Sequence, residues 1–205
     1  KLYASTGEGG NKELAQQDST YAGKIIRMDE DGKNREVYAK GIRNSQGFDW
    51  DTQHNNNLWA VDHGPSGFDG PPGGDEVNLI TKGGNYGWPL VSHDDNQPGL
   101  MAPKITFTPA IAPASIMMYH STVLPQFDGN LFVGGLRGTG IYRFILTKDG
   151  NDIASWEKLD KVDVGRVRDV VQGPGGYIYF TTSKQDGRGI PQPNDDKIYR
   201  LVPTP

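Results

Sequence analysis

The sequence predicts an all-β protein of the β-propeller class, and three observations support this. Helical periodicity is hard to find anywhere along the 205 residues. Short runs rich in aromatic and β-branched residues recur, as is typical of strands. Turn-forming residues separate these runs, among them many of the 28 glycines and 14 prolines. Several short strands in each of a series of repeats indicate propeller blades.

The repeat has two parts, an aromatic or β-branched strand followed downstream by an alternating strand. The first parts lie at 2–5, 58–61, 131–134 and 178–181, and the second parts at 24–28, 76–80, 141–145 and 197–201. The starts of the first parts are 56, 73 and 47 residues apart. Such unequal steps indicate blades that share a core and carry loops of different length.

Three of the four units also have a preceding inner strand, at 47–50, 115–119 and 167–171. Hairpin turns at 31–32, 128–130, 149–150 and 173–176 support the division. The first unit lacks an inner strand, so we expect about three and a half four-stranded blades, with an open edge through which copies could self-associate. Either a closed four-bladed ring or a segment of a larger ring fits this count.

Composition excludes several classes of function. The net charge is −4, the pI is about 5.5, and Lys and Arg form no basic stripe, so a nucleic-acid surface is not expected. No apolar run approaches the roughly 18–20 residues of a membrane span, so no transmembrane segment is expected. Cysteine is absent, so a metal would need oxygen or His ligands.

Candidate chemistry lies in the connections between strands, where propellers place their sites. Arg43 and Asn44 offer a guanidinium fork and an amide, suited to a carboxylate-rich or quinone-bearing ligand. Backbone carbonyls at Gly64 and Pro65 suit a hard cation such as Ca²⁺. Taken singly, each motif also fits a structural role: a turn with a surface ion pair, or a solvated strand end.

The order of these motifs resembles the glucose/sorbosone dehydrogenase family. The motifs that carry the resemblance are Arg43-Asn44-Ser45-Gln46-Gly47, His63-Gly64-Pro65, Gly74-Asp75-Glu76-Val77-Asn78, Gly83-Gly84-Asn85-Tyr86-Gly87-Trp88-Pro89, Arg166-Val167-Arg168-Asp169-Val170 and Ile198-Tyr199-Arg200-Leu201. The family comprises soluble, calcium- and PQQ-dependent (pyrroloquinoline quinone) aldose dehydrogenases with a six-bladed propeller. The resemblance covers essentially the whole chain, so residues 1–205 are expected to form one partial propeller domain of this family, from its C-terminal portion.

The resemblance implies roles for individual residues. The residues that would contact PQQ are Arg43, Asn44, Arg137, Arg166 and Arg168, of which the last two would grip its carboxylates and Arg137 stands where bacterial relatives carry Lys. The carbonyls of Gly64 and Pro65 would bind the calcium beside the cofactor. Glu76 and the Tyr86 carbonyl would bind a second, structural calcium. We expect the five cofactor residues to meet at one end of the propeller channel.

The sequence also departs from the family pattern. No position matches the general-base His, whose region would lie before Lys1, so no catalytic residue is assigned in this chain and the isolated chain is expected to be inactive. A glutamine that contacts PQQ from an early blade is also missing. The segment 66–73 is about six residues longer than the usual link, which puts the geometry of Glu76 in question.

The function implied by the resemblance is that of a secreted or periplasmic oxidoreductase, a quinoprotein that converts the C1 hydroxyl of an aldose sugar to a lactone. The electron acceptor is not identified by the sequence. The alternative is a non-catalytic propeller that binds sugar, a cell surface or a protein. Retention of Arg43, Asn44, Arg166 and Arg168 together favours the enzyme, because a binding module has no need of a carboxylate clamp.

Overall fold

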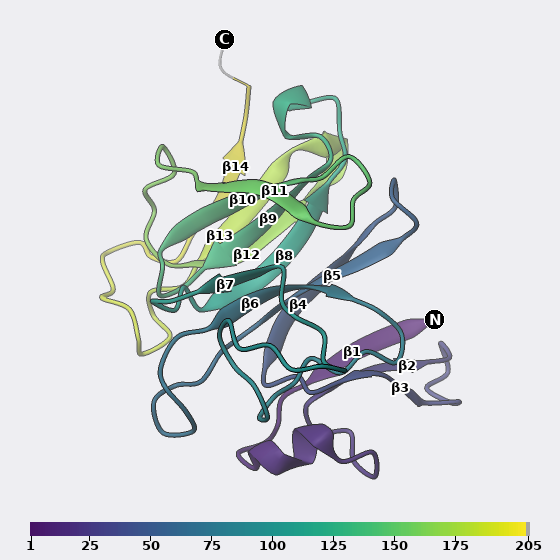
Figure 1. The fold of residues 1–205 in the computed structure, drawn as a ribbon. Coiled ribbons are helices and arrows are strands. Elements are labelled where there is room, and N and C mark those ends of the chain that lie inside the picture. The colour runs from purple at the N-terminus through teal and green to yellow at the C-terminus, as the bar shows by residue number, and fades with distance from the viewer. Residues whose placement is uncertain (204–205) are drawn as a thin grey trace. The chain divides into compact units, whose positions relative to one another are not determined.

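A computed structural model describes residues 1–203 and shows an all-β fold (Figure 1). Fourteen strands form four antiparallel sheets, and the described residues contain three short 3-10 helices and no α-helix. No helix within residues 1–203 is long and apolar enough to cross a membrane. The prediction of a partial β-propeller is confirmed.

Within each sheet the strands follow one another in chain order, the arrangement of a propeller blade. The first sheet contains β1 (Leu2–Thr6), β2 (Lys24–Met28) and β3 (Glu36–Lys40). The second contains β4 (Ser45–Asp51), β5 (Asn57–Asp62), β6 (Asp75–Ile80) and β7 (Ile105–Phe107). The third contains β8 (Pro113–Tyr119), β9 (Asn130–Gly135), β10 (Gly140–Leu146) and β11 (Ile153–Lys158). The fourth contains β12 (Val167–Gln172), β13 (Ile178–Thr182) and β14 (Ile198–Leu201).

The first sheet lacks an inner strand, as predicted, and β1 forms its edge. Four-stranded blades each need an outer strand, but the sequence does not locate the outermost strands β3, β7 and β11. Strand β7 has three residues, and five of the six residues of β11 are exposed, so neither shows the apolar alternation of a half-buried strand. The 3-10 helices are η1 (Lys12–Gln16), η2 (Pro125–Phe127) and η3 (Pro174–Gly176).

The chain divides into two compact units, which are described separately. Unit 1 contains residues 1–47 and 60–110, and unit 2 contains residues 48–59 and those from 111 onward. The boundary passes through the second sheet, so each unit holds two parts of the chain that are distant in sequence.

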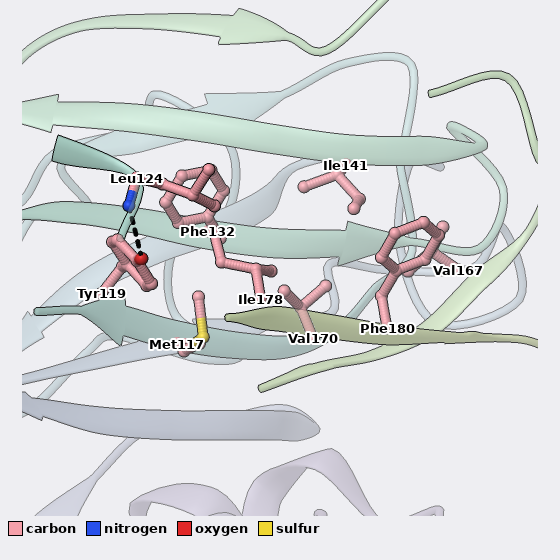
Figure 2. Packing of buried hydrophobic residues seen from close by; sticks show 9 residues of the cluster. All are labelled: Met117, Tyr119, Leu124, Phe132, Ile141, Val167, Val170, Ile178 and Phe180. Carbon is pink, nitrogen blue, oxygen red and sulfur yellow. Dashed lines mark hydrogen bonds between the residues drawn. The ribbon is translucent and has the colours of Figure 1, made fainter. Parts of the chain in front are cut away.

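The core of unit 2 lies between the third and fourth sheets (Figure 2). Its buried members are Met117, Tyr119, Leu124, Phe132, Ile141, Val167, Val170, Ile178 and Phe180. Phe132 makes edge-to-face contacts with Tyr119 and Phe127, at centroid distances of 6.3 and 5.2 Å. Val167 and Val170 of β12, the strand that contains Arg168, belong to the same cluster, so β12 packs against β8 and β9.

Unit 1 contains a buried cation. The Lys24 side chain is fully buried, and its Nζ donates hydrogen bonds to the carbonyls of Leu14, Ala15 and Ala22 at 2.9, 2.9 and 2.7 Å. Burial lowers the pKa of this ammonium group. All three of its N–H donors are used, so Lys24 joins the segment around η1 to β2. Lys24 is therefore a structural residue.

Candidate functional site

Arg43 and Asn44 lie in the connection that leads into β4, and one buried carboxylate holds their backbone. The Asp62 carboxylate, at the end of β5, accepts hydrogen bonds from the N–H of Arg43 at 2.8 Å and of Asn44 at 2.6 Å. Asp62 is 4% exposed, and burial raises its pKa to about 6 despite these two donors. The backbone of the pair is therefore held before any ligand binds.

A cavity of about 210 Å³ lies beside this pair. It is lined by Gly7, Glu8, Gly9, Gly10, Arg43 and Asn44. Glu8 is 8% exposed, and its carboxylate accepts a hydrogen bond from the Trp88 indole N–H at 3.2 Å. The cavity therefore has polar and charged groups in its wall, as a site for a small polar ligand requires.

The Arg43 guanidinium is itself part of a buried ion pair. Its Nε donates to Asp69 Oδ2 at 2.7 Å, and the two side chains are 9% and 8% exposed. The centre of the guanidinium lies 5.6 Å from the Trp88 ring centroid, within the range of a cation–π contact.

Arg166 and Arg168 come together on one carboxylate in unit 2. Arg166 Nη2 and Arg168 Nη2 donate to the same oxygen, Asp186 Oδ2, at 2.5 and 2.8 Å. Arg166 is also held by its Nε bond to the Ser183 carbonyl at 2.8 Å. The hydrogen bond from Arg166, with the Arg188 backbone N–H, lowers the pKa of Asp186 to about 2. The two arginines thus already bind a carboxylate jointly.

Arg137 is exposed, just after β9, and its backbone lies next to this pair. Arg166 Nη1 donates to the carbonyl of Leu136, the preceding residue, at 3.4 Å. Of the five predicted cofactor residues, Arg43 and Asn44 therefore adjoin each other in unit 1, and Arg137, Arg166 and Arg168 are neighbours in unit 2. That all five meet at one end of a channel stays a prediction.

Gly64 and Pro65 lie in a tight backbone crossing. A Cβ on Gly64 would come within 2.0 Å of the Gly73 carbonyl oxygen, so only glycine fits. The Pro65 carbonyl accepts a hydrogen bond from Gly73 N–H at 3.2 Å, which leaves one of its two lone pairs for a cation. Gly64 N–H is held by Asp75 Oδ1 at 3.0 Å.

The same contacts answer the question raised by the long segment 66–73. The segment closes on itself through the Gly73–Pro65 hydrogen bond, and β6 then pairs regularly with β7, Asp75 opposite Phe107 and Glu76 opposite Thr106. The extra residues therefore form a loop closed between Pro65 and Gly73 and leave the strand that contains Glu76 in register.

Glu76 lies beside Asn78, whose side-chain oxygen could bind a cation. Loss of solvation, together with the nearby charge of Asp62, raises its pKa to about 8. Its Oε2 accepts a hydrogen bond from Asn78 Nδ2 at 2.8 Å, while the buried Asn78 Oδ1 has no hydrogen-bond partner. An acceptor without a donor and a carboxyl group with a raised pKa both indicate a place where positive charge would be stabilising.

The fourth predicted calcium residue, Tyr86, is 3% exposed. Its hydroxyl donates to the Leu79 carbonyl at 2.7 Å and accepts from Thr81 N–H at 2.8 Å. These bonds leave the backbone carbonyl as the group that could bind a cation. No cluster of three or more His, Asp or Glu within residues 1–203 is arranged to hold a metal, so backbone and amide oxygens would have to complete either site.

Three residues of the site are not expected from the sequence: Glu8, Asp69 and Asp186. Each acts through contacts between segments distant in sequence. The signal available for Asp69 and Asp186 is weak, an aspartate among glycines in an irregular segment, which is also typical of an ordinary turn.

Comparison with known proteins shows clear similarity. Residues 1–199 match the sequence profile of the family described as glucose/sorbosone dehydrogenase. The aldose sugar dehydrogenase of Escherichia coli is 29% identical over 91% of this chain and 55% of its own length. The chain spans about half the length of the curated relatives that it matches.

Two solved structures extend the match over almost the whole chain. A putative glucose dehydrogenase of Thermus thermophilus superposes with a TM-score of 0.86 and 36% identity, over 98% of this chain and 62% of that one. The PQQ-bound aldose sugar dehydrogenase of Streptomyces coelicolor gives a TM-score of 0.82 and 31% identity, over 98% of this chain and 58% of that one.

Proposed function

Because the chain belongs to the glucose/sorbosone dehydrogenase family, we propose that it is the C-terminal portion of a PQQ- and calcium-dependent enzyme that oxidises aldose sugars at C1 to lactones. Sugar oxidation with PQQ is the activity to which the relatives point, since one is named an aldose sugar dehydrogenase and another contains PQQ. The residues of this chain supply the cofactor-binding part of that proposal.

The observation that carries the proposal is the joint grip of Arg166 and Arg168 on Asp186 Oδ2. Two guanidinium groups that converge on one carboxylate form a charge-assisted clamp for that group. A carboxylate of a bound cofactor could accept hydrogen bonds from the same two guanidinium groups, if Asp186 moved away from them or shared their N–H groups with the cofactor. Arg168 is the more accessible of the two, with 43% of its side chain exposed against 14% for Arg166.

Arg43 and Asn44 would make the other protein contacts to the cofactor. Both line the 210 Å³ cavity, and the Asp62 carboxylate holds their backbone in place. Glu8 adds a carboxylate to the same wall, where it could accept a hydrogen bond from a substrate hydroxyl. Arg137 would contribute a further positive charge next to Arg166.

PQQ, when bound, supplies the two-electron acceptor for sugar oxidation, and calcium beside it supplies a Lewis acid. The carbonyls of Gly64 and Pro65 would hold that calcium, and Pro65 retains a lone pair for it. Glu76, aided by Asn78 Oδ1 and the Tyr86 carbonyl, would hold the second calcium. Binding there would require Glu76 to lose its proton, which a divalent cation favours.

The remaining parts of the proposal concern the whole protein. The general base would lie outside residues 1–205, so the isolated chain is expected to bind ligand groups without turning over sugar. The proposed location is periplasmic or secreted, by analogy with the family. The proposed partners are an aldose sugar and a separate electron acceptor, with self-association possible at the edge strand β1.

Titration of PQQ into the full-length protein that carries this chain tests the proposal. Because Arg168 offers the exposed part of the clamp, Arg168→Ala is expected to weaken binding about tenfold or more, the effect of losing a charge-assisted pair. Arg200→Ala is the matched control, since its guanidinium lies 4.7 Å from the Tyr177 ring centroid and belongs to a different set of contacts. Failure of the wild type to bind PQQ, or equal binding by the Arg168 variant, would overturn the proposal.

A further inference from the structure

The loop at residues 66–73 contains an aspartate, Asp69, whose side chain is buried although the neighbouring residue is exposed. Gly73 N–H closes the base of the loop on the Pro65 carbonyl at 3.2 Å. Phe68, next to Asp69, is 83% exposed, whereas the Asp69 side chain is only 8% exposed. A carboxylate is almost never buried without a partner, so the loop is shaped around what Asp69 contacts.

The contact is the Arg43 guanidinium, and residues 63–69 provide an acceptor for each of its nitrogens. Arg43 Nε donates to Asp69 Oδ2 at 2.7 Å, and Nη2 donates to Ser66 Oγ at 3.0 Å. Nη1 reaches the His63 carbonyl at 3.3 Å. Three acceptors from one stretch of seven residues (63–69) therefore fix the guanidinium plane.

The acceptors are themselves held in place. Asp69 Oδ1, the oxygen that does not face Arg43, accepts a hydrogen bond from Ser66 N–H at 2.8 Å. The aspartate thus joins Ser66 and Arg43 through its two oxygens, which leaves its side chain little freedom to rotate. Burial alone would raise the pKa of Asp69, but the Ser66 N–H and Arg43 outweigh it and lower the pKa, so the pair stays charged at neutral pH.

The loop approaches Arg43 from outside the cavity. Arg43 and Asn44 line the 210 Å³ cavity together with residues 7–10, whereas neither Ser66 nor Asp69 belongs to its wall. Each Nη of Arg43 retains one N–H that has no hydrogen bond to Ser66, Asp69 or the His63 carbonyl. The contact therefore leaves two guanidinium N–H groups for a ligand, and the residues that make it do not line the cavity.

We propose that Asp69 is a positioning residue, which together with Ser66 orients the Arg43 guanidinium for a ligand in the cavity beside Asn44. The inference rests on the proposed function for the identity of that ligand, PQQ. The geometry of Arg43 itself does not depend on it. An alternative role for Asp69, as an anion that competes with the ligand, makes the opposite prediction for affinity.

The first test needs no ligand and uses the Arg43 Nε–H signal in the NMR spectrum of the chain. A guanidinium held by three acceptors is expected to give a resolved Nε–H resonance that exchanges slowly with water. Asp69→Ala should abolish this signal, and Ser66→Ala should shift it while the fold is retained. Glu30→Gln is the control for the loss of one negative charge, because the Glu30 side chain is 87% exposed. A slowly exchanging signal that survives in Asp69→Ala would overturn the inference.

The second test measures the affinity for PQQ in the full-length protein, with Trp88 beside Arg43 as a fluorescent reporter. Asp69→Ala should weaken binding about tenfold, because a displaced guanidinium loses its alignment with the ligand, while Asp69→Asn, which keeps an acceptor for Nε, should stay within about threefold of the wild type. Equal or tighter binding by Asp69→Ala would show competition and reject positioning.

The two failures are distinguishable. If the wild type does not bind PQQ, or Arg43→Ala binds PQQ as well as the wild type, the proposed function fails. The NMR experiment uses no ligand, so it still decides whether Asp69 holds the Arg43 guanidinium. If Arg43→Ala weakens binding and Asp69→Ala does not, only the positioning role fails. Should Asp69→Ala not fold, Ser66→Ala supplies the same comparison through the Nη2 contact, with an expected loss of about threefold in affinity.

Discussion

Replacement of Tyr119 by Phe is expected to destabilise the protein by about 2 kcal/mol, because it removes two buried hydrogen bonds and almost no volume. Tyr119 is fully buried in the core cluster. Its hydroxyl donates to the Gly176 carbonyl at 2.6 Å and accepts from Leu124 N–H at 3.2 Å, the bond drawn in Figure 2. The hydroxyl thus joins the end of β8 to η3, the turn between β12 and β13.

The magnitude follows from these contacts. Each hydrogen bond contributes about 0.5–1.5 kcal/mol net, and a donor or acceptor left unpaired in the core costs about 1–3 kcal/mol. The Leu124 N–H and the Gly176 carbonyl would both lose this partner, whereas the ring would keep its contact with Phe132. A net loss of about 2 kcal/mol corresponds to a decrease in Tm of roughly 4–8 °C for a chain of this size.

Urea denaturation monitored by circular dichroism measures the difference in the free energy of unfolding. Tyr21→Phe is the matched control, because it removes the same atom from a residue that is 44% exposed, and its cost should be below about 0.5 kcal/mol. Equal stability of Tyr119→Phe and Tyr21→Phe would refute the hydrogen-bond account of this core.

Two further predictions concern charged groups of the site. The Asp186 carboxyl should titrate in NMR with a pKa of about 2. Because its pKa is lower in the folded than in the unfolded state, the stability that this carboxylate contributes is present above about pH 4 and is lost as the pH falls through about 2. A pKa near 4 would disprove the pairing with Arg166. In calorimetric titration of Ca²⁺ into the cofactor-free chain, Glu76→Gln should bind at least about tenfold more weakly than the wild type, since a carboxylate ligand is lost, and equal binding would rule this site out.

Strands β5, β8 and β9 could be predicted from sequence because nearly all their residues are buried. Strand β9 is buried along its whole length, and its apolar run Leu131-Phe132-Val133 is typical of a buried strand. The outer strand β11 could not be predicted, because its pairing with β10 depends on backbone hydrogen bonds that leave no apolar pattern.

The site divides in a similar way. That Arg166 and Arg168 lie close together could be predicted from their spacing of two residues, because such residues share a face of a regular strand. In the structure Arg166 precedes β12 and the register shifts at Arg168, so their common contact is Asp186. Their partner could not be predicted, since Asp186 reaches them from a loop 18–20 residues downstream. Asp69 could not be predicted for the same reason. Its contact with Arg43 depends on how the loop 66–73 folds back, and neither composition nor periodicity indicates this.

Sugar-dependent dye reduction by the PQQ-reconstituted, full-length protein is the sharpest test of the proposed function. We expect reduction of an artificial electron acceptor that requires PQQ, Ca²⁺ and an aldose together, and that falls by at least about tenfold in Arg43→Ala and Arg168→Ala. Binding of PQQ without any aldose-dependent reduction, or activity unchanged in both variants, would contradict it and favour a non-catalytic propeller.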